Sequence, residues 1–145
     1  MAITTNAICN TFKKELLEAK HNFSNPGGNT FKLAMYTSSA TLGKSTTSFT
    51  TGNEVSSPSG YSSGGKALVN TGTSLATNTA ITDFADLSFV GVTLTARGAL
   101  IYNDSATGDP GVAVLDFGGD KTATSGTFTI QFPAFTTSAA ILRIA

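Results

Sequence analysis

Residues that usually carry catalysis, metal binding or crosslinks are scarce in this chain of 145 residues. It has one cysteine, Cys9, one histidine, His21, and no tryptophan. A single cysteine excludes an internal disulfide framework, and a zinc site usually takes three or four Cys, His or carboxylate ligands. A cysteine nucleophile needs a base within reach, and on one helix His21 would lie about 18 Å from Cys9. We expect Cys9 to face the core and His21 to be solvated near a helix C-terminus.

Charge is equally scarce. Nine basic and nine acidic residues give a net charge of zero, and charged residues make up 12% of the chain, against about 25% in an average soluble domain. Proteins that bind nucleic acid usually show a basic face, so no nucleic-acid partner is expected. The longest apolar run, Phe89 to Tyr102, contains Arg97 and falls short of the ~20 residues of a membrane span. The start of the chain lacks the pattern of a cleaved signal peptide.

The residues that replace charge are small and hydroxylated. The chain has 24 Thr, 15 Ser and 15 Gly, while its apolar fraction of 40% is ordinary. That fraction is sufficient for a hydrophobic core, so the Ser/Thr content does not indicate disorder. A chain of this length buries roughly 68–70% of its unfolded surface. We therefore expect one domain over residues 1–145.

One amphipathic helix is expected near the start. Ile8, Phe12, Leu16, Ala19 and Phe23 recur at steps of four and three, which places them on one stripe of a helix. The expected helix runs from about residue 7 to residue 22. Thr5 or Asn6 is its expected N-cap, and the run of Ser, Asn, Pro and Gly over residues 24–28 ends it. Residues 1–28 thus form an N-terminal arm and helix.

After residue 28 the pattern changes to period two, which indicates strands. The expected strands are a half-buried one over residues 31–36, short ones near 47–50, 53–56 and 66–70, a long one over 90–102, a central one over 112–117, an alternating one over 127–132 and a last one over 141–145. Turn-forming residues at 103–111, 118–126 and 133–138 separate them. Such spacing favours a mainly β fold, an antiparallel β-sandwich or jelly roll over residues 29–145, with one N-terminal helix.

Other short patterns are weak indications of chemistry. Residues 116–118 spell Asp-Phe-Gly and residues 118–122 spell Gly-Gly-Asp-Lys-Thr, but neither has the companion motifs of a kinase or a P-loop, so we interpret both as turns between strands. The residues Asn103, Asp104, Ser105 and Asp109 could offer oxygens to calcium, although the same residue types form ordinary turns. Asp83, Asp86 and Asp116 could supply a glycosidase pair. We expect no enzyme activity, cofactor or metal.

Several strings in fixed order resemble a family of small structural proteins of tailed bacteriophages. They are AICNTFKKELLEAKHNF, NTFKLAMYTSSATLG, YSSGGKAL, TARGALIYND, AVLDFGGDKTATSGTFTIQFP and the closing AAILRIA. The resemblance covers nearly the whole chain. It implies a virion component made in the host cytoplasm, and within the virion a decoration or cement protein on the capsid exterior. It also implies the major capsid protein and copies of the chain itself as partners. A tail, collar or fibre-base module and a host-glycan adhesin are the alternatives.

The expected interface lies in the N-terminal arm and the loops of residues 37–65. Ile3 belongs to the arm, while Phe49, Val55 and Tyr61 stand among Ser and Gly. Aromatic anchors often dominate binding energy, at about 2 kcal/mol or more each. The alternative is that the three loop residues cover an edge of the chain's own sandwich. Zero net charge suits close-packed copies, because they do not repel one another.

Overall fold

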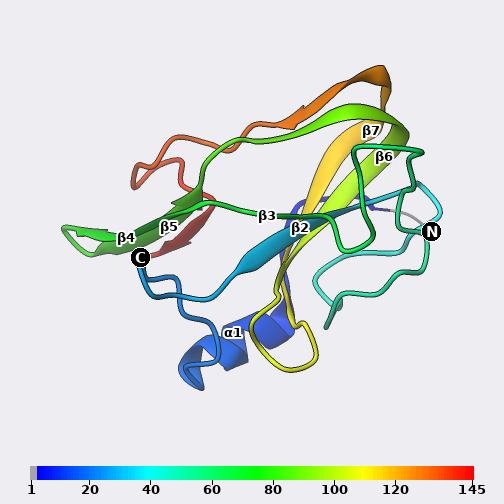
Figure 1. Cartoon of the computed structure of the whole chain (residues 1–145). Coiled ribbons are helices and arrows are strands. Elements are labelled where there is room, and N and C mark those ends of the chain that lie inside the picture. The colour runs from blue at the N-terminus through cyan, green and yellow to red at the C-terminus, as the bar shows by residue number, and fades with distance from the viewer. Residues whose placement is uncertain (1–2) are drawn as a thin grey trace.

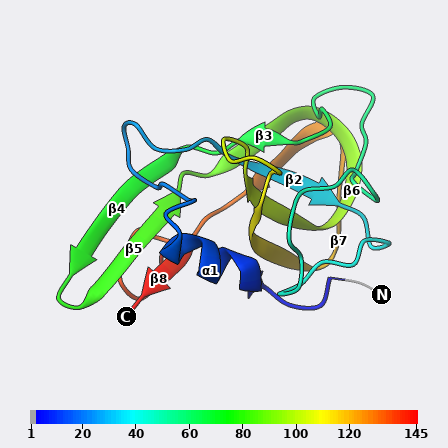
Figure 2. The same ribbon diagram turned by 90° about the horizontal axis from the view of Figure 1, so that it is seen from below.

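The fold is mainly β, with two antiparallel sheets and one short helix (Figures 1 and 2). The computed structural model describes residues 3–145, and strands make up 46% of the chain. The larger sheet has the strand order β1-β7-β6-β2-β3 and the smaller one β4-β5-β8. The elements are β1 (Ala7–Ile8), α1 (Asn10–Leu17), β2 (Phe31–Tyr36), β3 (Lys66–Ala67), β4 (Asn70–Ala76), β5 (Thr79–Phe84), β6 (Leu87–Asn103), β7 (Gly111–Ile130) and β8 (Leu142–Ile144).

A long curled ribbon of β6 and β7 dominates the larger sheet (Figure 1). Its pairing runs from Leu87 opposite Ile130 to Tyr102 opposite Gly111, with several register shifts that mark bulges. The predicted turn over residues 118–126 is therefore wrong, because β7 continues through it. Gly118, with a φ of 79°, lies where the ribbon bends, a backbone conformation that glycine adopts readily. The Asp-Phe-Gly and Gly-Gly-Asp-Lys-Thr strings consequently lie inside β7, not in turns between strands.

The helix is shorter than the periodicity predicts. Ala7 and Ile8 pair with Val114 and Ala113 of β7 instead of joining the helix, so α1 begins at Asn10 with Cys9 as its N-cap. The predicted caps are wrong, because Cys9 occupies that position without a side-chain cap bond and the Asn6 Oδ1 accepts the backbone N–H of Asp116. The helix ends at Leu17, well before the predicted end at residue 22.

β2 is a central strand. It pairs with β6 along its whole length, from Phe31 opposite Asn103 to Tyr36 opposite Gly98, and β3 covers part of its other edge. The prediction of a half-buried strand is wrong, since five of its six residues are buried and only Lys32 is partly exposed. Side chains on both faces meet other parts of the chain. The strand position itself is confirmed, as are those of β6 and β8.

The segment between β2 and β3 is a long loop instead of the two predicted strands. Only single bridges form there, between Tyr36 and Glu54 and between Ser48 and Pro110. The strand predicted over residues 66–70 divides, because β3 ends at Ala67 in the larger sheet. The chain then crosses to the smaller sheet, where β4 and β5 form a hairpin that the sequence did not predict (Figure 2).

One hydrophobic cluster contains residues from Ile3 to Leu142 and includes side chains of both sheets. Its aromatic part joins the helix to both sheets. Phe23 stacks on Phe31 of β2 with ring centroids 4.3 Å apart, and Phe12 of α1 packs edge-on against Phe23 at 6.0 Å. Phe84 of β5 lies 6.0 Å from Phe31. These contacts fix the position of α1 beside the smaller sheet.

Candidate functional site

An apolar groove lies between α1 and the smaller sheet, and we call it the helix groove. It has a volume of about 470 Å³, and its apolar lining comes from α1, from the turn after it, and from β5 and β8. It includes Leu16, Leu17, Ala80, Ile81, Leu142 and Ile144. Three apolar side chains on its border are open to solvent, since Leu17 is 91% exposed, Ile144 63% and Ile8 36%. The two charged residues among its described lining, Lys13 and Arg143, are both basic.

The groove exists because a helix of eight residues is too short to cover the sheet beside it. Phe12 turns inward and is 2% exposed, and Leu16 packs partly against the core. Leu17 follows on the adjacent side of the helix and reaches no partner that would bury it. Figure 2 shows β8 next to one end of α1, with the hairpin of β4 and β5 extending beyond both. The helix groove is thus an apolar surface that the chain leaves uncovered.

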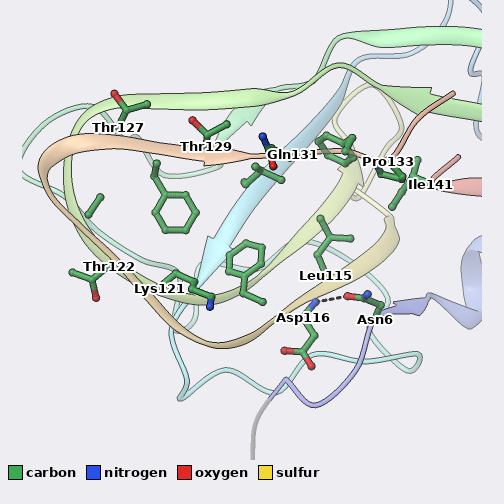
Figure 3. A pocket seen from close by; sticks show the side chains of 15 residues that line it. Asn6, Leu115, Asp116, Lys121, Thr122, Thr127, Thr129, Gln131, Pro133 and Ile141 are labelled. Atoms are coloured by element: carbon green, nitrogen blue, oxygen red, sulfur yellow. Dashed lines mark hydrogen bonds between the residues drawn. The ribbon is translucent and has the colours of Figure 1, made fainter. Parts of the chain in front are cut away.

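A second groove lies on the concave side of the curled β7, and we call it the ribbon groove (Figure 3). Its volume is about 580 Å³. Leu115, Phe117, Phe128, Phe132 and Ile141 supply apolar lining from both arms of the curl and from the segment before β8. The Phe117 and Phe128 rings lie 5.9 Å apart. Polar residues complete the lining: Asn6, Asp116, Lys121, Thr122, Thr127, Thr129 and Gln131.

One ion pair lies beside the ribbon groove. Arg97 of β6 donates to the carboxylate of Asp116 on β7. Hydrogen bonds from the Gly118 backbone N–H and from Arg97 lower the pKa of Asp116, because both stabilise its charged form. Asp116 is therefore ionised and paired with Arg97 at the rim of the ribbon groove, so it is not a proton donor at neutral pH. Figure 3 shows Asn6 bonded to the Asp116 backbone at the same rim.

The four predicted interface residues do not form a free surface. Ile3 is fully buried, Val55 is 5% exposed and Tyr61 8% exposed, so all three belong to the chain's own core. Phe49 is partly buried and stacks on Tyr102 at 4.7 Å between ring centroids. The interface assignment of these residues is corrected accordingly. The loops fold back over β2 and β6, and their apolar side chains are what holds them there.

Tyr61 shows how firmly this loop is attached. Its hydroxyl accepts the Met35 backbone N–H at 2.9 Å and donates to the Glu54 carboxylate at 2.7 Å. The same carboxylate accepts hydrogen bonds from the Ser63 hydroxyl and the Gly64 backbone N–H. Burial raises the pKa of Tyr61 far above its ordinary value, since the phenolate would be desolvated. The hydroxyl is thus a structural donor.

His21 is buried, and the prediction of a solvated position is wrong. Its ring packs between Phe12 and Phe31. Its Nε2 lies 3.2 Å from the Glu15 carboxylate and its Nδ1 lies 3.1 Å from the Asn103 side-chain nitrogen. The network joins the C-terminal part of α1 to the end of β6. A single histidine in a polar stretch of sequence gave no signal for this contact, which spans most of the chain.

The described residues offer no assembled metal-binding cluster. No group of three or more His, Cys, Asp or Glu side chains over residues 3–145 is placed to hold a metal ion. In the loop considered for calcium, Asp104 pairs with Lys32 at 3.3 Å and the Asn103 side-chain oxygen accepts the Ser105 N–H. Burial and the nearby Glu15 raise the pKa of the Cys9 thiol to about 11, so the thiol stays protonated at neutral pH.

Comparisons of the chain with protein-family models, with curated proteins and with solved structures find no match. Among residues 3–145, no helix is long and apolar enough to cross a membrane.

Proposed function

We propose that this chain is a structural protein of a bacteriophage virion, a capsid decoration or cement protein. In this role it sits on the capsid exterior and binds the major capsid protein lattice by non-covalent contacts. The ordered strings that resemble tailed-phage virion proteins support the proposal, as does a neutral, Thr-rich surface that lets many copies lie close together. Its two sheets then act as a small β-sandwich-like body, an interpretation supported by Phe84 and Leu142 of the smaller sheet lying in the shared core.

The observation that carries the proposal is the helix groove. An apolar surface rimmed by charged or polar residues is a common feature of protein-binding sites. Leu17, Ile144 and Ile8 surround this groove and keep 91%, 63% and 36% exposure. Apolar residues that fill a partner's pocket are the usual centre of a protein interface, with charged residues at its rim. Lys13 and Arg143 stand at that rim.

Replacing Leu17 by Glu tests this assignment. The side chain is 91% exposed, so the variant should fold normally, yet burying a carboxylate in an apolar contact is costly. We expect capsids lacking this protein to bind the variant at least about tenfold more weakly than wild type, a difference of ~1.4 kcal/mol. The measurement is co-sedimentation of purified protein with such capsids.

The matched control is Val90→Glu. Val90 is 68% exposed on β6 and lies outside the helix groove, so this variant carries the same charge change without touching the proposed contact. It should bind capsids like wild type. Equal binding by Leu17→Glu and wild type would contradict the assignment of the groove. Failure of wild type to bind any capsid would contradict the decoration role itself.

A second candidate, a host-glycan adhesin, is favoured by the ribbon groove. Its Phe117, Phe128 and Phe132 offer aromatic surface within a rim of hydroxyl and amide groups, a combination of apolar body and a few polar groups found in small-ligand sites. A glycan array with the purified protein tests it. Binding that is lost in Phe128→Ala would support the adhesin role, and no bound glycan would oppose it. A tail or collar module is the remaining alternative, and it differs from a shell protein in copy number.

A further inference from the structure

The outer edge of β4 is an open sheet edge. In the smaller sheet the strand order is β4-β5-β8, so β5 covers only one side of β4. Asn25 contacts the first residue of β4 by donating to the Asn70 carbonyl. Beyond it, Thr73 to Ala76 are exposed, and Leu75 is 70% exposed. Figure 2 shows this hairpin projecting from the body of the molecule.

From Thr73 to Ala76, this edge lacks the features that usually prevent strands from pairing. Proteins protect edges with lysines, prolines, inward-pointing charges, β-bulges or a covering helix or loop. The β-bulge of β4 lies between Asn70 and Thr73, so the strand is regular from Thr73 to its end. No charged residue and no proline occurs from residue 67 to residue 82, between Lys66 and Asp83. The exposed part of β4 is instead Thr-Ser-Leu-Ala. Its Thr favours a strand, and none of the four side chains carries a charge that would oppose pairing. The edge is therefore open to another strand.

The hairpin register identifies which backbone groups face outward. Ala76 pairs with Thr79 across the two-residue turn, and Leu75, Ser74 and Thr73 pair with Ala80, Ile81 and Thr82. In such a hairpin the pair next to the turn exchanges both hydrogen bonds, and the pairs then alternate. Ser74 thus directs its N–H and C=O toward β5. Leu75 and Thr73 direct theirs outward, where no strand of residues 3–145 pairs with them.

We propose that the β4 edge pairs antiparallel with the same edge of a second copy of this chain. The register that uses both outward residues places Thr73 opposite Leu75 of the second copy. This pair exchanges two hydrogen bonds, and the two-fold axis generates a second, identical pair. Ser74 then faces its own counterpart, at the ~4.5 Å Cα separation of a non-hydrogen-bonded pair. The two three-stranded sheets become one six-stranded sheet. Two neutral chains approach without net repulsion.

This pairing does not depend on the proposed function, because it is measurable in the isolated protein with no capsid present. Sedimentation equilibrium of wild type should give twice the 14.8 kDa mass of one chain. Leu75→Lys should sediment as a monomer, because two lysines would be brought close across the axis. Val90→Lys, a charge added at a similarly exposed site elsewhere, should remain a dimer. Far-UV circular dichroism should be the same for all three.

A cysteine crosslink tests the register independently. The single native cysteine, Cys9, is buried, and a Cα separation of ~4.5 Å lies within the range of disulfides. Ser74→Cys should therefore form a disulfide-linked dimer about tenfold faster or more than Val90→Cys under the same mild oxidation. A wild-type mass of one chain at every concentration would overturn the proposal. So would a dimer unaffected by Leu75→Lys, or equal crosslinking rates for the two cysteine variants.

Discussion

At the scale of single residues, His21 connects the helix to the rest of the molecule. The Asn103 amide donates to Nδ1, so the His21 proton is on Nε2, where it faces Glu15. The Asn103 amide also donates to the Asn29 side chain at 2.9 Å. Burial lowers the pKa of His21 from its ordinary value of 6.5, against the opposing effect of Glu15 and with that of Lys20. Neutral histidine is therefore the form that the folded state prefers.

This network predicts a loss of stability in acid. Because the folded-state pKa is the lower one, the unfolded chain binds more protons as the pH falls below about 6.5, and the free energy of unfolding declines until the folded form is also protonated. Protonation of Nδ1 would place an N–H against the Asn103 amide. Urea denaturation should show wild type losing stability as the pH falls below about 6.5.

His21→Gln separates this effect from the titration of carboxylates elsewhere. The variant lacks a group that titrates in this range, so its stability should change less with pH, while at neutral pH it should be about 1–2 kcal/mol less stable through the lost contacts. The difference between the two pH profiles reports His21 alone. Parallel profiles for variant and wild type would contradict the assignment.

The burial of the predicted interface residues could not be predicted from sequence. Val55 and Tyr61 lie in a stretch rich in Ser and Gly, where apolar side chains suggest exposure to a partner. Their burial depends on contacts with β2, which lies about twenty or more residues earlier in the chain. The Tyr61 bond to the Met35 backbone is one of these contacts. Leu17 is the most exposed large apolar residue among those described. It lies outside the apolar stripe of the predicted helix, and this departure from the pattern is the signal that could have identified it as a candidate contact residue.

At the scale of elements, the end of α1 is set by a backbone motif that the sequence hides. Ala19 has a φ of 57°, its N–H bonds to the Leu16 carbonyl, and the Lys20 N–H bonds to the Glu15 carbonyl at 3.0 Å. These are the two bonds of a Schellman motif, whose left-handed residue is usually glycine. Alanine gave no stop signal there, so periodicity extended the predicted helix to residue 22.

Ala19→Gly should therefore stabilise the protein. Glycine adopts the left-handed conformation without the strain that a Cβ brings, and we expect the free energy of unfolding to rise by about 0.5–1 kcal/mol in urea denaturation. The control is Ala134→Gly, at an exposed loop position without a positive φ, which should leave stability unchanged or slightly lower. A destabilised Ala19→Gly would mean that the helix does not end in this motif.

In the β6–β7 ribbon, the sequence predicted a turn where the strand in fact continues. Residues 118–126 contain glycines, hydroxyl side chains and charges, the composition of a turn. They nevertheless continue β7, because cross-strand pairs such as Thr95 with Thr122 hold the ribbon, with their hydroxyls 2.8 Å apart. A ribbon exposed along much of its length has no need of alternating apolar residues, so period two disappears from its sequence.

At the scale of the whole molecule, the mainly β class and the single helix could be predicted, whereas the division into two sheets could not. The strands with apolar alternation, β2 and β6, were placed correctly from sequence. The hairpin of β4 and β5 was missed, because the residues of β4 show no alternation of apolar and polar side chains, and its exposed part is three small or hydroxylated residues around Leu75. That same lack of patterning leaves the β4 edge unprotected. The small sheet and the short helix together create the helix groove.

In the proposed decoration role, the helix groove attaches this chain to a capsid shell. An electron-microscopy map of the phage particle, with this chain fitted into it, would show whether it does. We expect density for the chain in many copies over the capsid exterior, with Leu17, Ile8 and Ile144 turned toward the major capsid protein. Density at the tail or collar in a few copies, or a helix groove that faces solvent on the shell, would contradict it.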